Sequence, residues 1–230
     1  MLTPAKINKC ILFLFITLLS ESFMDNRHAC KDLDTAESDN ITLNIHVRQY
    51  VKNYIRNNRE ALIAIQGRSA RPFRLIDSVF GRYGLPKEMK YLAVIESELN
   101  TRALSPVGAR GAWQLMPQTA QLLGLKVDSN RDERIQLGKS TVAAAKYLKD
   151  LYGEFGDWLL VLAAYNAGPA PVYRAIHRSG SRDFWALEKY LPAESRGHVK
   201  RFIASHYYFE GNGSVTTVTK GEWVSYKSGI

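Results

Sequence analysis

The stretch LPKEMKYLAVIESELN, at positions 85–100, predicts a short helix with one unusual residue on its apolar side. Pro86 suits the first position of a helix, because the N–H that a proline lacks would have no partner there. Apolar side chains follow at three- and four-residue spacings, at Met89, Leu92, Ile95 and Leu99. Glu96 lies on the same side of the helix, whereas Glu98 points away, about 200° further round the axis.

The position of Glu96 among apolar side chains suggests acid–base chemistry. A carboxyl group loses hydration in such surroundings, which disfavours its charged form. A general acid that works near neutral pH needs a protonated carboxyl. A glutamate at the boundary of the core, paired with an arginine, would produce the same pattern. The helix alone leaves both interpretations open, and the residues downstream decide between them.

The N-terminus indicates export. Lys6 and Lys9 precede the apolar run 11–19, and Ser20-Glu21-Ser22 follows it. This is the order of a secretory signal peptide, and about nine apolar residues are too few to span a bilayer. We therefore expect a signal peptide at residues 1–22 and location in the periplasm or cell envelope, with cleavage or retention of the signal left open. Residues 23–40 are polar and aperiodic, which predicts a linker.

Cysteine content and charge narrow the class of partner. Cys10 falls within the signal peptide, so Cys30 alone would remain after cleavage and no internal disulfide would form. The net charge of +9 favours polyanionic partners such as acidic envelope polymers. Export argues against nucleic acid. The chain has no zinc-type Cys/His spacing and no phosphate-binding glycine loop, so we expect neither a metal nor another cofactor.

The chain of 230 residues suits one domain with tails, and its periodicity is mainly helical. Helices are predicted near residues 47–55, 61–65, 73–80, 117–123, 137–151, 158–167, 171–177 and 194–209. Gly81 and Gly84 are expected to stop the third of these, and Asp157 to cap the sixth. Strand signals occur in the tail, at 214–219 and 223–226. The expected organisation is a mainly α domain at 41–212, with its core at about 80–180, and a C-terminal tail at 213–230.

Three segments carry more polar and aromatic chemistry than packing requires. They are Glu96-Ser97, GARGAWQLMP at 108–117 and AYNAG at 164–168. Glycines in the second segment let the backbone turn sharply. Aromatic rings and amides near a carboxyl suit a carbohydrate, because sugar C–H faces stack on rings while hydroxyls and acetamides bond to amides. Each of these residues alone could be a core, turn or cap residue, and we expect Trp113 to serve mainly in packing.

In this order, the three segments resemble the soluble lytic transglycosylase (SLT) domain, which has a goose-type lysozyme-like fold. The flanking segments look most like the membrane-bound lytic transglycosylase D branch, at residues 85–92, 144–152 and 156–162. The resemblance covers about residues 42–212. It implies a single lysozyme-like α domain with an N-terminal helical extension.

The resemblance also implies a reaction. Lytic transglycosylases cleave the β-1,4 bond between N-acetylmuramic acid and N-acetylglucosamine in peptidoglycan and leave 1,6-anhydro-muramic acid ends. The single acid/base glutamate of the family falls on Glu96. Substrate-binding positions of the family fall on Ser97, Gln114, Met116, Tyr165 and Asn166. No cofactor is implied. The expected partner is the glycan strand, bound by a monomer, and the sequence identifies no envelope protein partner.

His198 is a departure from the family pattern. It lies in LPAESRGHVK, residues 191–200, where the family usually has a tyrosine that points toward the catalytic carboxyl. An imidazole can still donate a hydrogen bond there, but it titrates at about pH 6.5 and would then place a positive charge beside Glu96. His198 is therefore counted with the substrate site, in an enzyme that is either active with an altered acid limb or weakened.

Two other functions compete with this one. A goose-type lysozyme would hydrolyse the same bond with water and would need a second carboxylate opposite Glu96. Asp128, Asp132 and Glu133 are available in the chain, but the sequence does not place them across a groove. A non-catalytic peptidoglycan-binding module would explain His198 as a sign of lost activity, although the intact Glu96 argues against it.

Overall fold

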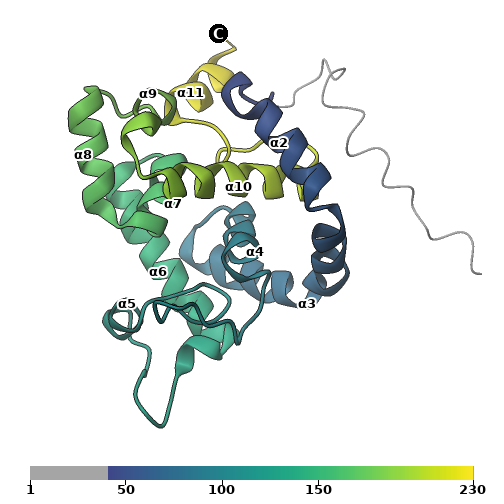
Figure 1. Ribbon diagram of the computed structural model, residues 1–230, viewed down its shortest axis with the longest axis vertical. Coiled ribbons are helices and arrows are strands. Elements are labelled where there is room, and N and C mark those ends of the chain that lie inside the picture. Colours follow the sequence, from purple (N-terminus) through teal and green to yellow (C-terminus); the bar gives the residue numbers. More distant parts are fainter. Residues whose placement is uncertain (1–40, 230) are drawn as a thin grey trace, which may run out of the picture. The chain divides into compact units, whose positions relative to one another are not determined.

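A computed structural model describes residues 41–229 (Figure 1). The helices are α2 (Ile45–Asn57), α3 (Arg59–Tyr83), α4 (Tyr91–Ser97), α5 (Pro117–Leu122), α6 (Leu137–Phe155), α7 (Trp158–Ala167), α8 (Pro169–Ser179), α9 (Phe184–Leu187), α10 (Ala193–Glu210) and α11 (Lys220–Ser228). Short 3-10 helices are η2 (Lys87–Lys90), η3 (Glu133–Ile135) and η4 (Glu188–Tyr190). The predicted signal peptide and linker lie outside the described residues.

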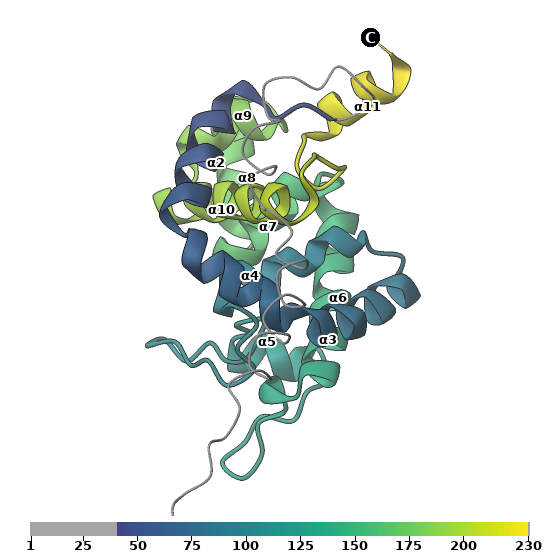
Figure 2. The ribbon, with the colours of Figure 1, turned by 90° about the vertical axis from the view of Figure 1, so that its right-hand side faces the viewer.

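Helix α7 forms the centre of the core. Its residues 158–164 are all buried, as expected of a helix that is apolar on every side. It packs against α6, α8 and α10, and α10 packs in turn against α2 and α4 (Figure 1). Helices α3 and α6 lie side by side (Figure 2). No helix within residues 41–229 is long and apolar enough to span a membrane.

Helix α3 corrects one prediction. Residues 61–80 form part of one continuous helix, not two, and Gly81 does not end it. Pro72 lies inside this helix and leaves one backbone carbonyl without its usual donor. The helix continues because its buried residues keep one face, which packs on α6, at Leu62, Ile65, Ser69, Ile76, Val79 and Phe80. Gly84, with φ of 69°, provides the left-handed end.

The stretch at 85–100 is only partly the helix that its pattern predicts. It begins with the 3-10 helix η2, and α4 ends at Ser97. Glu98 and Leu99 follow with φ of 55° and 64°, a left-handed conformation that is uncommon for non-glycine residues. The chain therefore turns sharply immediately after Glu96 and Ser97.

The tail contains no strand within its described residues, so both strand predictions there are wrong. Residues 220–228 form α11, which begins with a capping box between Thr219 and Glu222. The β-branched residues before it use their hydroxyls in turns: the backbone N–H of Ser214 donates to Thr217 Oγ1. Val218 is buried, and the Lys220 N–H donates to the Asp157 carboxylate, so the tail packs on the domain.

Candidate functional site

Glu96 lies at the end of α4, beside a hollow of about 760 Å³ that we call the Glu96 hollow. The last residues of α4 and the turn after it, residues 95–101, line this hollow together with Arg68 from α3. Arg68 pairs with the exposed carboxylate of Glu98 at 3.3 Å. The arginine partner that the sequence allowed for Glu96 therefore belongs to Glu98. Glu96 itself is mostly buried, with 14% of its side chain exposed.

The partner of Glu96 is His198. Nε2 of His198, on α10, lies 2.8 Å from Oε1 of Glu96, and the His198 side chain is only 2% exposed. Its other ring nitrogen, Nδ1, is buried and has no hydrogen-bond partner among residues 41–229. Because a neutral imidazole carries one N–H, we assign the proton to Nε2, where it donates to Glu96. Oε2 of Glu96 makes no hydrogen bond within the described part of the chain.

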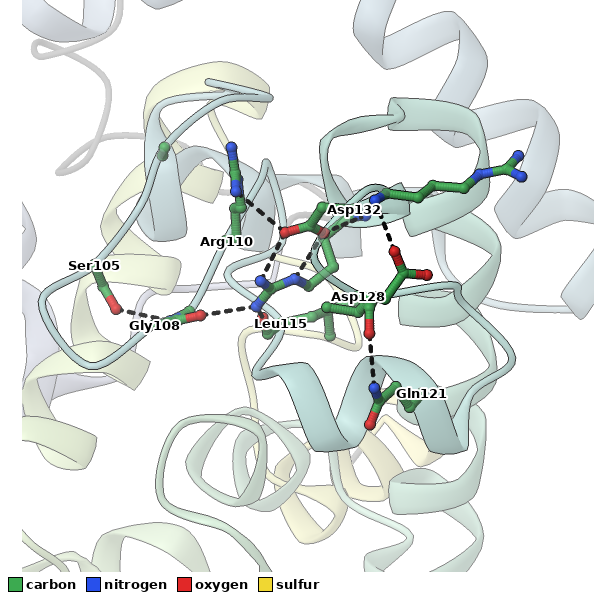
Figure 3. A network of polar contacts seen from close by, with 12 residues as sticks. Ser105, Gly108, Arg110, Leu115, Gln121, Asp128 and Asp132 are labelled. Carbon is green, nitrogen blue, oxygen red and sulfur yellow. Dashed lines mark hydrogen bonds and ion pairs between the residues drawn. The ribbon is translucent and has the colours of Figure 1, made fainter.

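A buried arginine, Arg134, holds the glycine-rich loop 105–116. Figure 3 shows the polar contacts around Gly108, Leu115 and Asp132. Arg134 donates to the carbonyl oxygens of Gly108 and Leu115 at 2.7 and 2.9 Å. Asp132 orients Arg134 through an ion pair of 2.8 Å, and this guanidinium lowers the pKa of the Asp132 carboxyl. Gly111, with φ of 81°, lies so close that a Cβ there would be 2.2 Å from the Arg134 carbonyl oxygen.

No pattern in the sequence identifies Arg134 as part of the site. It stands in the run RDER at 131–134, which reads as solvated surface charge. Its role depends on carbonyl groups 26 and 19 residues away in the chain, for which the sequence carries no local signal. Arg110, to which no role was assigned, pairs with the same Asp132 at 3.3 Å.

Two of the expected site residues attach this loop to helices. Ser97 donates its hydroxyl to the carbonyl oxygen of Ala112 at 2.9 Å. Tyr165, on α7, donates to the carbonyl oxygen of Trp113 at 2.7 Å. Burial raises the pKa of Tyr165, and the nearby charge of Glu96 raises it further. The loop is thus fixed to both α4 and α7.

Trp113 is a packing residue, as expected. Its ring is fully buried against Phe80, and its Nε1–H donates to Thr141 at 3.0 Å. Gln114 adopts a positive φ of 46°, and its side-chain amide donates to the Gly111 carbonyl, so it shapes the turn.

The remaining expected residues, Asn166 and Met116, do not line the Glu96 hollow. Asn166 accepts a hydrogen bond from Ser195, at 2.8 Å; Ser195 lies on α10 one turn before His198. Met116, just before α5, is 38% exposed. The structure therefore gathers the three chemistry-bearing segments around α4, although Glu96 and Ser97 are the only members of the predicted set that line the described hollow.

Known proteins resemble this chain in sequence and in fold. The family model for the transglycosylase SLT domain matches residues 81–188. Membrane-bound lytic murein transglycosylase D of Escherichia coli strain K12 is 34% identical over 166 residues. The match covers 70% of this chain and 36% of that protein. Residues 81–188 of this chain form a transglycosylase SLT domain.

Solved structures place the SLT domain of this chain in the expected mainly α, lysozyme-like fold. The 70 kDa soluble lytic transglycosylase from Escherichia coli superposes with a TM-score of 0.56 and 28% identity, over 74% of this chain and 31% of that one. Its complex with bulgecin A gives a TM-score of 0.57 and 26% identity, with the same coverage. Helices α2 and α3 largely precede the family match and form the predicted N-terminal extension.

The SLT relatives are longer proteins. The soluble lytic murein transglycosylase of the same strain is 33% identical over 162 residues, which cover 64% of this chain and 25% of that one. The chain therefore matches about a third or less of the length of these relatives.

The carboxylates that a hydrolase would require are engaged elsewhere in this SLT domain. Asp132 pairs with Arg110 and Arg134. Glu133 pairs with Arg131 and with Lys139 of α6, and Asp128 accepts backbone N–H groups from the two residues at 130–131. None of the three lines the Glu96 hollow.

Proposed function

We propose that this chain is a peptidoglycan lytic transglycosylase. Its substrate is the glycan strand, which it cleaves at the β-1,4 bond between N-acetylmuramic acid and N-acetylglucosamine. One observation carries the proposal. Within residues 41–229, one carboxyl oxygen of Glu96 is bonded to a buried histidine and the other is unbonded, beside a hollow whose only other lining carboxylate in this range is paired with Arg68. One carboxyl that serves as both acid and base suits a reaction without a water nucleophile.

The proposed reaction has two proton transfers through Glu96. Its protonated carboxyl first gives a proton to the glycosidic oxygen as the C1–O bond of muramic acid breaks. The resulting carboxylate then takes the proton of the C6 hydroxyl as that oxygen bonds to C1. The product is a 1,6-anhydro-muramic acid end, and Glu96 regains its proton, so that no water is consumed.

His198 is proposed to position the acid. With its proton on Nε2, the neutral ring donates to Oε1 and occupies that oxygen in both protonation states of Glu96. The exchangeable proton is then carried by Oε2, the oxygen left for the sugar. A charged ring would need a second N–H at Nδ1, where no acceptor lies within the described residues. This supports a working enzyme over a weakened one.

The other expected residues are proposed to hold the sugars near Glu96. Met116 is exposed enough to contact a glycan, and Gln114 presents the turn beside it. Asn166 is bonded to Ser195, which lies on α10 one turn before the histidine that contacts the acid. Tyr165 and Ser97 would act by fixing the loop, since both hydroxyls already bond to loop carbonyls.

Mass spectrometry of the fragments released from purified peptidoglycan tests this function, with Glu96→Gln as the matched variant. We expect fragments that end in 1,6-anhydro-muramic acid from the wild type and none from Glu96→Gln. Reducing ends would identify a goose-type hydrolase and require a second carboxylate. No release over a range of pH, with binding to sacculi kept by both proteins, would identify a binding module.

Export of the chain is a separate proposal. Residues 1–22 carry the charged, apolar and small-residue order of a signal peptide. The mass of the protein recovered from the periplasmic or membrane fraction tests it. A mass reduced by about the first 22 residues indicates cleavage, an unreduced mass in the membrane fraction indicates retention as an anchor, and recovery from the cytosol contradicts export.

A further inference from the structure

A second hollow of about 760 Å³ lies between α3, α6 and the segment that follows α5. Its lining includes the apolar residues Leu75, Val79, Leu125 and Val142. Five cationic side chains surround them, at Arg82, Lys126, Arg131, Lys139 and Lys146, against the single carboxylate of Glu133. We call this the basic hollow.

Glu133 organises the basic hollow without neutralising it. Its carboxylate, 5% exposed, contacts Arg131 at 2.9 Å and Lys139 at 2.6 Å. The backbone N–H of Lys126 and the Lys139 ammonium lower the pKa of Glu133, which keeps it ionised near neutral pH. Two cations therefore share one buried anion. Three others, Arg82, Lys126 and Lys146, make no ion pair within residues 41–229.

The basic hollow is separate from the Glu96 hollow. The two have no lining residue in common, although α3 contributes to both. Arg68 at one hollow and Arg82 at the other are 14 positions apart in this helix, which corresponds to about 21 Å along its axis. A ligand in the basic hollow would therefore be a different part of the polymer from the sugar at Glu96.

We propose that the basic hollow binds the peptide stem of peptidoglycan, a short peptide that combines several carboxylates with small apolar side chains. This inference rests on the proposed function, since the glycan strand would bring the peptide to the protein. Cations around the hollow suit the carboxylates, and the apolar lining suits the methyl groups of alanine residues. A small inorganic anion would leave that apolar surface unused, and a flat anionic bilayer would reach the rim alone.

Binding of the free tetrapeptide stem, released from sacculi by an amidase, tests the inference by calorimetry on the full chain. Arg82→Glu/Lys146→Glu reverses two unpaired cations of the hollow. Arg71→Glu/Lys149→Glu reverses two exposed cations on the same helices that do not line it, with the same change in net charge. We expect the first pair to weaken binding about tenfold or more and the second to stay within about twofold. A tetrapeptide with amidated carboxylates should bind as weakly as the first variant binds the acidic one.

If both double variants lose the same tetrapeptide affinity, the effect is one of net charge and the inference is overturned. The inference is also overturned if the wild type shows no saturable binding of the tetrapeptide. Binding to anionic phospholipid vesicles that Arg82→Glu/Lys146→Glu abolishes, with peptide binding unchanged, would assign the hollow to a membrane surface instead. Cleavage of peptide-free glycan keeps the two proposals separate. Wild-type protein that binds the tetrapeptide but cleaves no glycan would refute the proposed function alone, and protein that cleaves glycan but binds no tetrapeptide would refute this inference alone.

Discussion

At the scale of single residues, the contact between Glu96 and His198 leads to a prediction about donors. His198→Phe keeps a ring in the buried space but removes the N–H, whereas His198→Gln and His198→Tyr keep a donor. A hydrogen bond to an ionisable group contributes about 1.5–3 kcal/mol, so we expect His198→Phe to lower kcat about 10- to 100-fold with little change in KM. The two donor variants should recover most of the loss.

The pattern among these variants separates positioning from folding. Thermal unfolding of each protein shows whether the domain is intact. If His198→Phe and His198→Gln are equally slow while equally stable, donation to Glu96 is not the function of His198. If His198→Phe is as fast as the wild type, the contact has no part in catalysis.

Two glycines of the loop provide a second prediction at this scale. Gly108 and Gly111 both have positive φ, of 88° and 81°. An added Cβ meets nothing within 4 Å at Gly108, but lies 2.2 Å from the Arg134 carbonyl oxygen at Gly111. Gly108→Ala should cost the strain of a left-handed residue, about 1–2 kcal/mol in the free energy of unfolding. Gly111→Ala should cost clearly more and should also displace the loop.

Urea unfolding and glycan cleavage measure these two effects. We expect Gly108→Ala to retain activity and Gly111→Ala to lose most of it at a temperature where it is still folded. Similar losses of stability in the two variants would show that Arg134 moves to admit the methyl group and does not hold the loop rigidly.

At the scale of elements, Asp157 connects two helices. One carboxylate oxygen accepts N–H groups from Leu159 and Leu160 and caps α7, and the other accepts the N–H of Lys220 at the start of α11. Asp157→Ala should lose about 0.5–2 kcal/mol from the cap and should loosen α11. Burial raises the pKa of Asp157, so the neutral Asp157→Asn, which keeps an acceptor, should be milder.

Limited proteolysis with intact-mass detection checks this prediction. Asp157→Ala should be cut within α11 faster than the wild type. Asp183→Ala serves as the control, because Asp183 caps α9 in the same way but makes no hydrogen bond to α11 within the described residues. Equal cutting of the two variants would mean that α11 is held by its other contacts.

The helices also show which parts of the fold can be predicted from sequence patterns. Helices α6, α7 and α10 are predictable because caps and apolar spacing are local signals. The continuity of α3 is not, because packing on α6 outweighs the local cost of Pro72. The strand predictions in the tail fail for a similar reason. Its β-branched residues suit a strand, but in the structure Thr217 and Thr219 use their hydroxyls in a turn and a helix cap.

Some residues of the candidate site can likewise be identified from the sequence, and others cannot. Glu96 is recognisable because a carboxyl in an apolar stripe is a local anomaly, and the resemblance places the residues around it. Arg134 and Ser195 are not recognisable, since their partners are side chains and carbonyl groups that only the folded chain brings near. Roles that depend on long-range hydrogen bonds therefore need the structure.

At the scale of the whole molecule, the buried His206 and the partly buried Asp132 make stability depend on pH. Burial lowers the pKa of His206 from 6.5 to about 3, and the charge of Lys90 adds to this. Between these two pH values the unfolded chain binds a proton at His206 that the folded chain does not. The contribution of the neutral His206 to stability is therefore fully present above about pH 6.5 and is lost as the pH falls toward 3. Arg134 lowers the pKa of Asp132 below its ordinary 3.8. The contribution of the Asp132 carboxylate to stability is therefore present above this pH and is lost only as the pH falls below it.

Thermal unfolding as a function of pH should therefore show a slope that belongs to His206. For each pH unit below about 6.5, the free energy of unfolding should fall by about 1.4 kcal/mol. This corresponds to roughly 3–5 °C in Tm for a domain of this size. His206→Gln keeps a donor for Ser214, which His206 contacts at 2.9 Å, but cannot titrate. The His206→Gln protein should be less stable than the wild type near pH 7.5, and its stability should approach or exceed that of the wild type near pH 4.5.

His177→Gln, on the exposed surface of α8, should keep the wild-type slope. Parallel curves for all three proteins would show that acid sensitivity arises elsewhere in the fold.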